Sequence, residues 1–177
     1  TMLFSATIPK EILRIAKKYM GEYEFVSIKK EPLTANLTDQ IYFEVSNADK
    51  FDALCRIIDI EHEFYGLVFC RTKVDVDKIG RRLVDRGYDA DALHGDISQY
   101  QREAILNKFK RKRTNILVAT DVAARGIDIV DLTHVINYSL PQDPEYYIHR
   151  IGRTGRAGKE GTAITFVTPE EYRSLLF

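Results

Sequence analysis

The feature that most constrains the fold of this chain is an alternation of short apolar runs with amphipathic segments. Residues 67–70 and 116–119 are almost entirely apolar, as expected of strands that are covered on both faces. Between such runs, residues 51–58 place apolar side chains at the i, i+3, i+4 and i+7 spacing of one helix face. Parallel strands need crossover connections, which helices supply. The alternation therefore predicts an α/β domain with an open, mostly parallel sheet and helices on both faces.

The predicted elements are spread unevenly along the chain. Strands are expected at residues 2–5, 25–28, 41–45, 67–70, 89–93, 116–119, 135–138 and 163–167, and helices at 9–20, 51–58, 76–83 and 102–109. Residues 30–38 lack periodicity, as is typical of a linker, and the few elements before them are too little to fold alone. We therefore interpret residues 1–29 as the end of a preceding domain, 30–38 as an interdomain linker and 39–177 as the principal domain. The chain is expected to be a fragment.

Charge balance restricts how this chain can bind a polyanion. The 26 basic residues equal the 26 acidic ones, so such contacts must come from local placement of Arg and Lys and from backbone N–H groups.

Cys55 and Cys70 lie in apolar runs at a spacing that fits neither a zinc site nor a redox pair, and we expect both in the core. No apolar stretch approaches the roughly 20 residues that span a bilayer, and no signal peptide is visible, which favours a cytoplasmic protein without a membrane partner.

The densest functional signal is the segment 149–158, His-Arg-Ile-Gly-Arg-Thr-Gly-Arg-Ala-Gly. Arg150, Arg153 and Arg156 recur at every third position, and on a helical turn this spacing would align their guanidinium groups roughly along one side. Each guanidinium has a planar fork that matches two phosphate oxygens. The alternative is a solvated basic helix end, but glycines at this density would destabilise such a helix. The segment therefore indicates contact with phosphate groups.

Other polar residues directly follow predicted strands, where ligands bind in sheets of this kind. Thr120 offers a hydroxyl and a backbone N–H to a phosphate, and Asp121 is interpreted as the cap of the short helix that follows. Thr72 stands at the start of a helix, whose N-terminus favours an anion. Gln99 and Arg102 are three positions apart at another helix start, so together they can hold one sugar-phosphate segment.

These segments, in this order, resemble the motifs of the DEAD-box ATP-dependent RNA helicases. Residues 149–156 resemble motif VI, 119–129 motif V, 69–73 motif IV, and Ser5-Ala6-Thr7 motif III, while His94-Gly95-Asp96 and the pair Gln99 and Arg102 resemble two further elements of the family. The resemblance covers essentially the whole chain. It implies that residues 39–177 form the second, C-terminal RecA-like domain of such a helicase, and that residues 1–29 end its ATP-binding domain.

The resemblance also implies a role for each matched residue. Arg153 and Arg156 would be arginine fingers that reach the γ-phosphate of ATP, and His149 would link motif VI to the active site of the partner domain. Gly126 and Asp128 would lie beside the nucleotide, and Ser5 and Thr7 would couple the two domains. The residues implied to bind the RNA backbone are Thr72, Gly95, Gln99, Arg102 and Thr120. Arg125 stays open between an RNA contact and an interdomain pair.

The chain lacks the segments that hold ATP itself. It contains no G-x-x-x-x-G-K-[ST] segment and no Asp-Glu-Ala-Asp tetrad, so the resemblance implies that ATP and Mg²⁺ are held mainly by the first RecA-like domain. The chain alone is expected to be inactive, and whether it self-associates stays open. The basic run 108–113 ends a predicted helix, where cations suit the helix dipole, so we assign it no RNA role. Two alternatives remain, a DNA helicase of a related family and a non-catalytic RNA-binding, protein-binding or dimerisation module.

Overall fold

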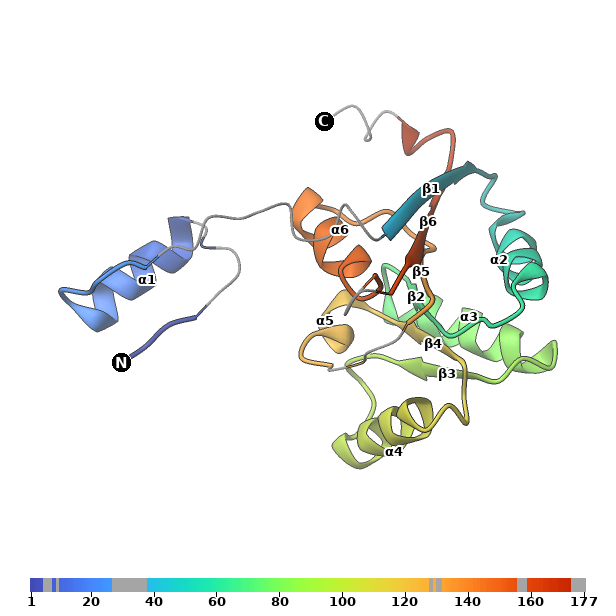
Figure 1. The fold of residues 1–177 in the computed structure, drawn as a ribbon, viewed down its shortest axis with the longest axis horizontal. Coiled ribbons are helices and arrows are strands. Elements are labelled where there is room, and N and C mark those ends of the chain that lie inside the picture. The colour runs from blue at the N-terminus through green and yellow to red at the C-terminus, as the bar shows by residue number, and fades with distance from the viewer. Residues whose placement is uncertain are drawn as a thin grey trace. The chain divides into compact units, whose positions relative to one another are not determined.

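The computed structural model describes residues 1–4, 8, 10–26, 38–127, 129, 132–155 and 159–172 (Figure 1). It divides the chain into two units, Thr1–Glu31 and Pro32–Phe177, and the division falls inside the segment predicted as a linker. The smaller unit contains the helix α1, Lys10–Met20, as predicted. Glu11 in its first turn and Lys17 in its last turn suit the helix dipole.

The two strands predicted before the linker are wrong for the residues that the structure describes there. Residues 2–4 and 25–26 are not in strands, and the rest of the two predicted ranges lies outside the described residues. A strand needs a neighbour that satisfies its backbone N–H and C=O groups. No described residue of this unit is paired in a sheet, and the apolar side chains of Phe4 and Val26 are exposed.

The larger unit is built around a six-stranded sheet in the order β1-β6-β5-β2-β4-β3. Its strands are β1 (Thr38–Glu44), β2 (Gly66–Phe69), β3 (Ala90–Leu93), β4 (Ile116–Ala119), β5 (His134–Asn137) and β6 (Gly161–Val167). Every neighbouring pair is parallel, and the predicted strands from residue 41 onward are confirmed, with ends that differ by at most three residues. The carboxyl ends of all six strands therefore lie along one edge of the sheet.

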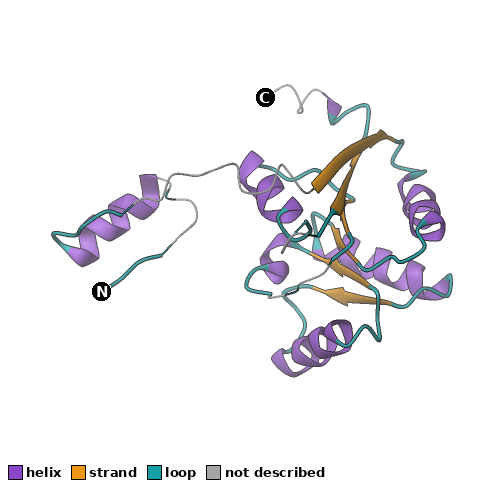
Figure 2. Cartoon of the chain, viewed as in Figure 1, coloured by secondary structure: helices purple, strands orange, loops and turns teal. Residues whose placement is uncertain are grey.

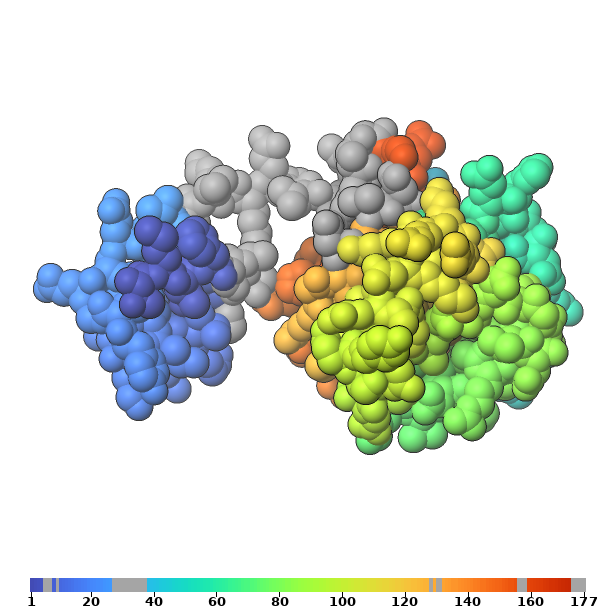
Figure 3. Space-filling model, turned by 90° about the horizontal axis from the view of Figure 1, so that it is seen from below, coloured from blue at the N-terminus to red at the C-terminus, as the bar shows by residue number. Residues whose placement is uncertain are grey.

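Helices cover both faces of this sheet, as predicted. Figure 2 shows α2 (Lys50–Ile60) and α3 (Lys73–Asp85) on one face, and α4 (Gln99–Lys110), α5 (Asp121–Ala124) and α6 (Pro144–Ile151) on the other. The space-filling view in Figure 3 shows α4, in yellow-green, on the surface of this unit. Within the described part of the chain, no helix has the length and apolar character needed to cross a membrane.

The central strands are buried on both faces of the sheet. Successive side chains point to opposite faces, so Leu67 and Leu117 pack under α4 and α5 while Val68 and Val118 pack under α2 and α3. Each of these side chains is almost fully buried, which contributes about 1.5–3 kcal/mol per residue. Cys55 and Cys70 are free and buried, as expected, and burial raises the pKa of the Cys70 thiol. Two packed faces thus fix the strand ends that carry the candidate site.

Candidate functional site

Three neighbouring strands are each followed, within three residues, by a residue that the sequence singled out. β2, β4 and β3 are adjacent, and Thr72, Thr120 and Gly95 follow them at the same edge of the sheet. Thr72 is the N-cap of α3, where its hydroxyl accepts a 3.1 Å hydrogen bond from the Asp75 backbone N–H and donates at 2.7 Å to the Asp75 carboxylate. The exposed Thr72 thus stands at the positive end of a helix, which suits an anion.

Thr120 caps α5, and the interpretation of Asp121 as the cap is wrong. The Thr120 hydroxyl accepts a 3.4 Å hydrogen bond from the Ala123 backbone N–H, while Asp121 is already the first helical residue. An N-cap residue keeps an extended backbone, which Thr120 has with φ −85° and ψ 159°. Asp121 instead directs its carboxylate to Arg150.

Gln99 and Arg102 begin α4, but their side chains have different partners. The Gln99 amide donates a 2.8 Å hydrogen bond to Glu103 of the same helix. The Arg102 guanidinium donates a 2.7 Å hydrogen bond to the carbonyl oxygen of Ala123 in α5. The structure therefore brings Arg102 to the helix that Thr120 caps, and keeps Gln99 exposed on the surface of α4.

The turn at Gly95 is held by the residues on either side of it. The buried His94 ring lies 3.0 Å from the Asp77 carboxylate in α3, and Lys73 pairs with Asp96 at 2.6 Å. The hydrogen bond from Lys73 lowers the pKa of Asp96. A Cβ added at Gly95 would meet no atom within 4 Å, so a ligand backbone has room to approach here. The sequence matched His94 and Asp96 to a motif without giving them this supporting role.

The expected alignment of arginines along one helix side is wrong for the two that the structure describes. Arg150 is in the last turn of α6, only 2% exposed, and is directed into the domain. Arg153 lies beyond the helix, which ends at Ile151, and donates a 2.7 Å hydrogen bond from Nη1 to the carbonyl oxygen of Ile127. Arg156 lies outside the described residues. Gly152 is the C-cap of α6, so the α-helical spacing does not extend to Arg153.

Arg153 meets the segment that carries another candidate nucleotide residue. Ile127 follows Gly126, which is exposed and has φ +70°, in the left-handed region that favours glycine. Asp128, as well as Ser5 and Thr7, lies outside the described residues. Arg125 donates a 2.8 Å hydrogen bond to the Tyr146 hydroxyl in α6. His149 is exposed near the end of α6.

Comparison with known proteins identifies the family of this chain. Residues 49–158 match the helicase conserved C-terminal domain family. The chain belongs to this family.

The relatives of this helicase C-terminal domain are DEAD-box RNA helicases. It is 54% identical over 176 residues to a probable ATP-dependent RNA helicase of Methanocaldococcus jannaschii, covering 99% of the chain and 47% of that protein. It is 53% identical over 175 residues to the DEAD-box ATP-dependent RNA helicase CshA of Geobacillus kaustophilus, covering 99% of the chain and 38% of that protein. The chain thus spans less than half the length of these relatives.

Solved structures agree with the predicted RecA-like architecture, which is confirmed. The crystal structure of a DEAD box protein from Methanococcus jannaschii superposes with a TM-score of 0.74 at 55% identity, covering 97% of this chain and 46% of that one. The structure of S. cerevisiae Dbp5 bound to RNA and ADP BeF3 gives a TM-score of 0.85 at 34% identity, covering 98% of this chain and 46% of that one.

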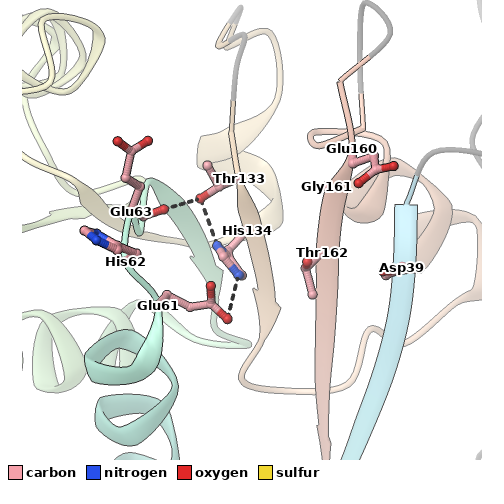
Figure 4. A pocket seen from close by; sticks show the side chains of 9 residues that line it. All are labelled: Asp39, Glu61, His62, Glu63, Thr133, His134, Glu160, Gly161 and Thr162. Carbon is pink, nitrogen blue, oxygen red and sulfur yellow. Dashed lines mark hydrogen bonds and ion pairs between the residues drawn. The ribbon is translucent and has the colours of Figure 1, made fainter.

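A hollow in the helicase C-terminal domain lies at the other end of the sheet. It has a volume of about 470 Å³ and is lined by Asp39, Glu61, His62, Glu63, Thr133, His134, Glu160, Gly161 and Thr162 (Figure 4). The His134 ring lies 3.5 Å from Glu61 and 2.8 Å from the Thr133 hydroxyl, and burial lowers the pKa of His134. None of the residues implied to bind RNA or ATP lines this hollow, and its carboxylates repel phosphate groups.

Proposed function

We propose that this chain is the second motor domain of an ATP-dependent RNA helicase, in which it completes an ATP site begun on the first RecA-like domain and provides half of the RNA-binding surface. The observation that carries the proposal is that the segment 120–127 contributes residues to both candidate ligand sites. Thr120, implied to bind RNA, begins this segment, and Gly126 and the carbonyl that receives Arg153 end it. One short stretch of backbone thus connects the two candidate ligand sites.

The RNA side of the site suits a single strand bound through its backbone. The candidate groups are the hydroxyls of Thr72 and Thr120, the open turn at Gly95, and the guanidinium of Arg102. Such groups can contact phosphates and sugars, and contacts of this kind position a strand without reading its sequence. Discrimination of RNA from DNA then comes from the 2′-hydroxyl and from the shape of the strand.

The nucleotide side fits an arginine that reaches a bound phosphate from a second domain. Arg153 is half-buried and donates from Nη1 to the carbonyl oxygen of Ile127, beside the exposed Gly126. An arginine supplied in this way can raise the rate of phosphoryl transfer by roughly 10³–10⁵. ATP supplies the phosphate bond that is broken, and the first RecA-like domain is proposed to hold ATP and Mg²⁺. Among the described residues, no cluster of three or more His, Cys, Asp or Glu is arranged to hold a metal ion.

The residues outside the described ranges complete this proposal. Arg156 is proposed to join Arg153 at the γ-phosphate and Asp128 to join Gly126 at the nucleotide. Ser5 and Thr7 are proposed to transmit the state of the first domain, and the exposed His149 to contact that domain. ATP and RNA would each favour the closed arrangement of the two domains, and each ligand would therefore strengthen binding of the other.

The test is the ATPase rate of the full-length protein with RNA, with single-stranded DNA and with neither. We expect RNA to stimulate the rate, and Arg153→Ala to lower the stimulated rate by at least about 10³-fold while binding of RNA without nucleotide changes little. Equal stimulation by DNA would favour a DNA helicase. An unchanged rate in Arg153→Ala, with the variant folded, would favour the non-catalytic binding module.

A further inference from the structure

Among the described residues of the segment 149–158, Arg150 is the most deeply buried charged side chain. Its Nε and Nη2 donate to the two carboxylate oxygens of Asp121 at 2.7 and 2.8 Å. Its Nη1 donates to the Asn137 side chain at 3.1 Å and to the Ser139 carbonyl oxygen at 2.7 Å. The guanidinium also stands over the ring of Phe69 at 4.9 Å. Its fork is fully engaged inside the domain, so Arg150 does not serve as a phosphate ligand.

The partners of Arg150 extend across the domain. Asn137 in β5 donates a 3.0 Å hydrogen bond to Thr165 in β6, so the network joins two strands to α6 and α5. A bidentate arginine–carboxylate pair fixes the relative orientation of its two elements as well as their distance. α5 has only four residues, too few to be stable as a helix without contacts to the rest of the domain.

The segment 120–127 is joined to the segment that carries Arg150 and Arg153 at a second point. Asp121 is paired with Arg150 at the start of segment 120–127, and Ile127 receives Arg153 at its end. Between these points Arg125 donates to Tyr146 in α6. The segment that carries Thr120 and the segment that carries Arg153 are therefore fastened to each other at both ends.

We propose that Arg150 is a positioning residue that, through Asp121, holds the RNA-side Thr120 and the nucleotide-side Arg153 in one fixed relation, so that occupancy of one site is transmitted to the other. The inference rests on the proposed function. It assigns to the first arginine of the segment 149–158 a role different from that of Arg153. Removing the carboxylate charge of Asp121 leaves the buried Arg150 without its counter-ion, and α5 shifts relative to α6.

The experiment measures how much a non-hydrolysable ATP analogue tightens RNA binding by the full-length protein. Asp121→Asn keeps the size of the side chain and removes the charge. We expect the ratio of RNA affinities with and without the analogue to fall by at least about 10-fold, a larger factor than any loss of RNA affinity that the shift of α5 causes without the analogue. Arg150→Lys, which keeps the charge and loses the fork, should change the ratio in the same direction.

The matched control is Glu171→Gln, which weakens the ion pair between Lys50 and Glu171. That pair has a side-chain exposure of 6% and 30%, close to the 2% and 25% of Arg150 and Asp121, and it ties α2 to the chain after β6. We expect Glu171→Gln to lower the melting temperature and to leave the affinity ratio unchanged. An equal fall of the ratio in Glu171→Gln would mean general loosening and would overturn the inference.

Further outcomes separate this inference from the proposed function. If the RNA affinity of the wild-type protein is the same with and without the analogue, the proposed function itself is contradicted. Hydrogen exchange of the amides of residues 121–127 then tests whether Asp121 and Arg150 hold this segment in place. Faster exchange in Asp121→Asn supports this role, and unchanged exchange refutes it. If the wild type shows the coupling and folded Asp121→Asn and Arg150→Lys retain it, the function stands and the role of Arg150 is wrong.

Discussion

The guanidinium of Arg102 in α4 donates a 2.7 Å hydrogen bond to the carbonyl oxygen of Ala123 in α5. This bond ties the helix that begins after β3 to the helix that begins after β4, and these two strands are neighbours. Arg102 therefore supports the backbone beside Thr120 while it stands at the proposed RNA surface. Its removal should affect both the placement of α5 and the binding of RNA.

Replacing Arg102 with alanine should weaken RNA binding by about 10- to 100-fold, because one charge-assisted hydrogen bond contributes roughly 1.5–3 kcal/mol. Fluorescence anisotropy with a labelled single-stranded RNA measures the effect. The matched control is Arg111→Ala, which removes an exposed arginine from the C-terminal end of α4, within the basic run to which we assign no RNA role. If Arg111→Ala weakens binding as much as Arg102→Ala, the effect is one of general charge.

Thr72→Val should lower the free energy of unfolding by about 1 kcal/mol, because valine keeps the shape of threonine but cannot cap α3. RNA affinity measured well below the melting temperature should fall by roughly 10-fold through loss of the proposed phosphate contact. Thr72→Ser retains the hydroxyl and should behave like the wild type in both chemical denaturation and RNA binding. A normal RNA affinity in Thr72→Val would remove Thr72 from the proposed RNA surface.

Gly126→Ala and Gly87→Ala form a matched pair. Both glycines have positive φ, +70° and +89°, and an added Cβ would meet no atom within 4 Å at either position. Each substitution should therefore cost roughly 1–2 kcal/mol of stability through backbone strain alone. Gly126→Ala should also lower the RNA-stimulated ATPase rate by about 10- to 100-fold, because it displaces the backbone that anchors Arg153. Equal ATPase rates in the two variants would contradict a nucleotide-side role for Gly126.

Stability should fall as the pH drops below about 6.5, the pKa of an unperturbed histidine. Burial lowers the pKa of His134 in the folded domain, outweighing the opposing effect of Glu61. Between the two pKa values the unfolded chain binds more protons than the folded one, so acid favours unfolding, and the loss is complete below the folded pKa. Denaturant titrations at a series of pH values measure this slope. His134→Gln should flatten it, whereas the exposed His62→Gln should not.

The sequence by itself determined the layered fold of the larger unit. Apolar runs such as 67–70 and 116–119 are too short for buried helices and so indicate strands covered on both faces, and the segments between them bury one helical stripe each. Because the strands are parallel, the sequence also placed Thr72, Thr120 and Gly95 at one edge of the sheet. These conclusions depend on local periodicity and on the chirality of the chain, which a sequence records directly.

The partners of each side chain were decided only by the tertiary structure. The even spacing of Arg150 and Arg153 could not reveal that α6 ends between them. One guanidinium is therefore buried against Asp121 and the ring of Phe69, while the other donates to Ile127. Likewise, Thr120 and Asp121 are both residue types that cap helices well. Thr120 is the cap, because the Asp121 carboxylate accepts hydrogen bonds from Arg150, which is distant in sequence. Strand-like residues 2–4 show the converse, since a strand exists only where another strand pairs with it. Contacts between segments far apart in the chain depend on packing, which residue spacing does not encode.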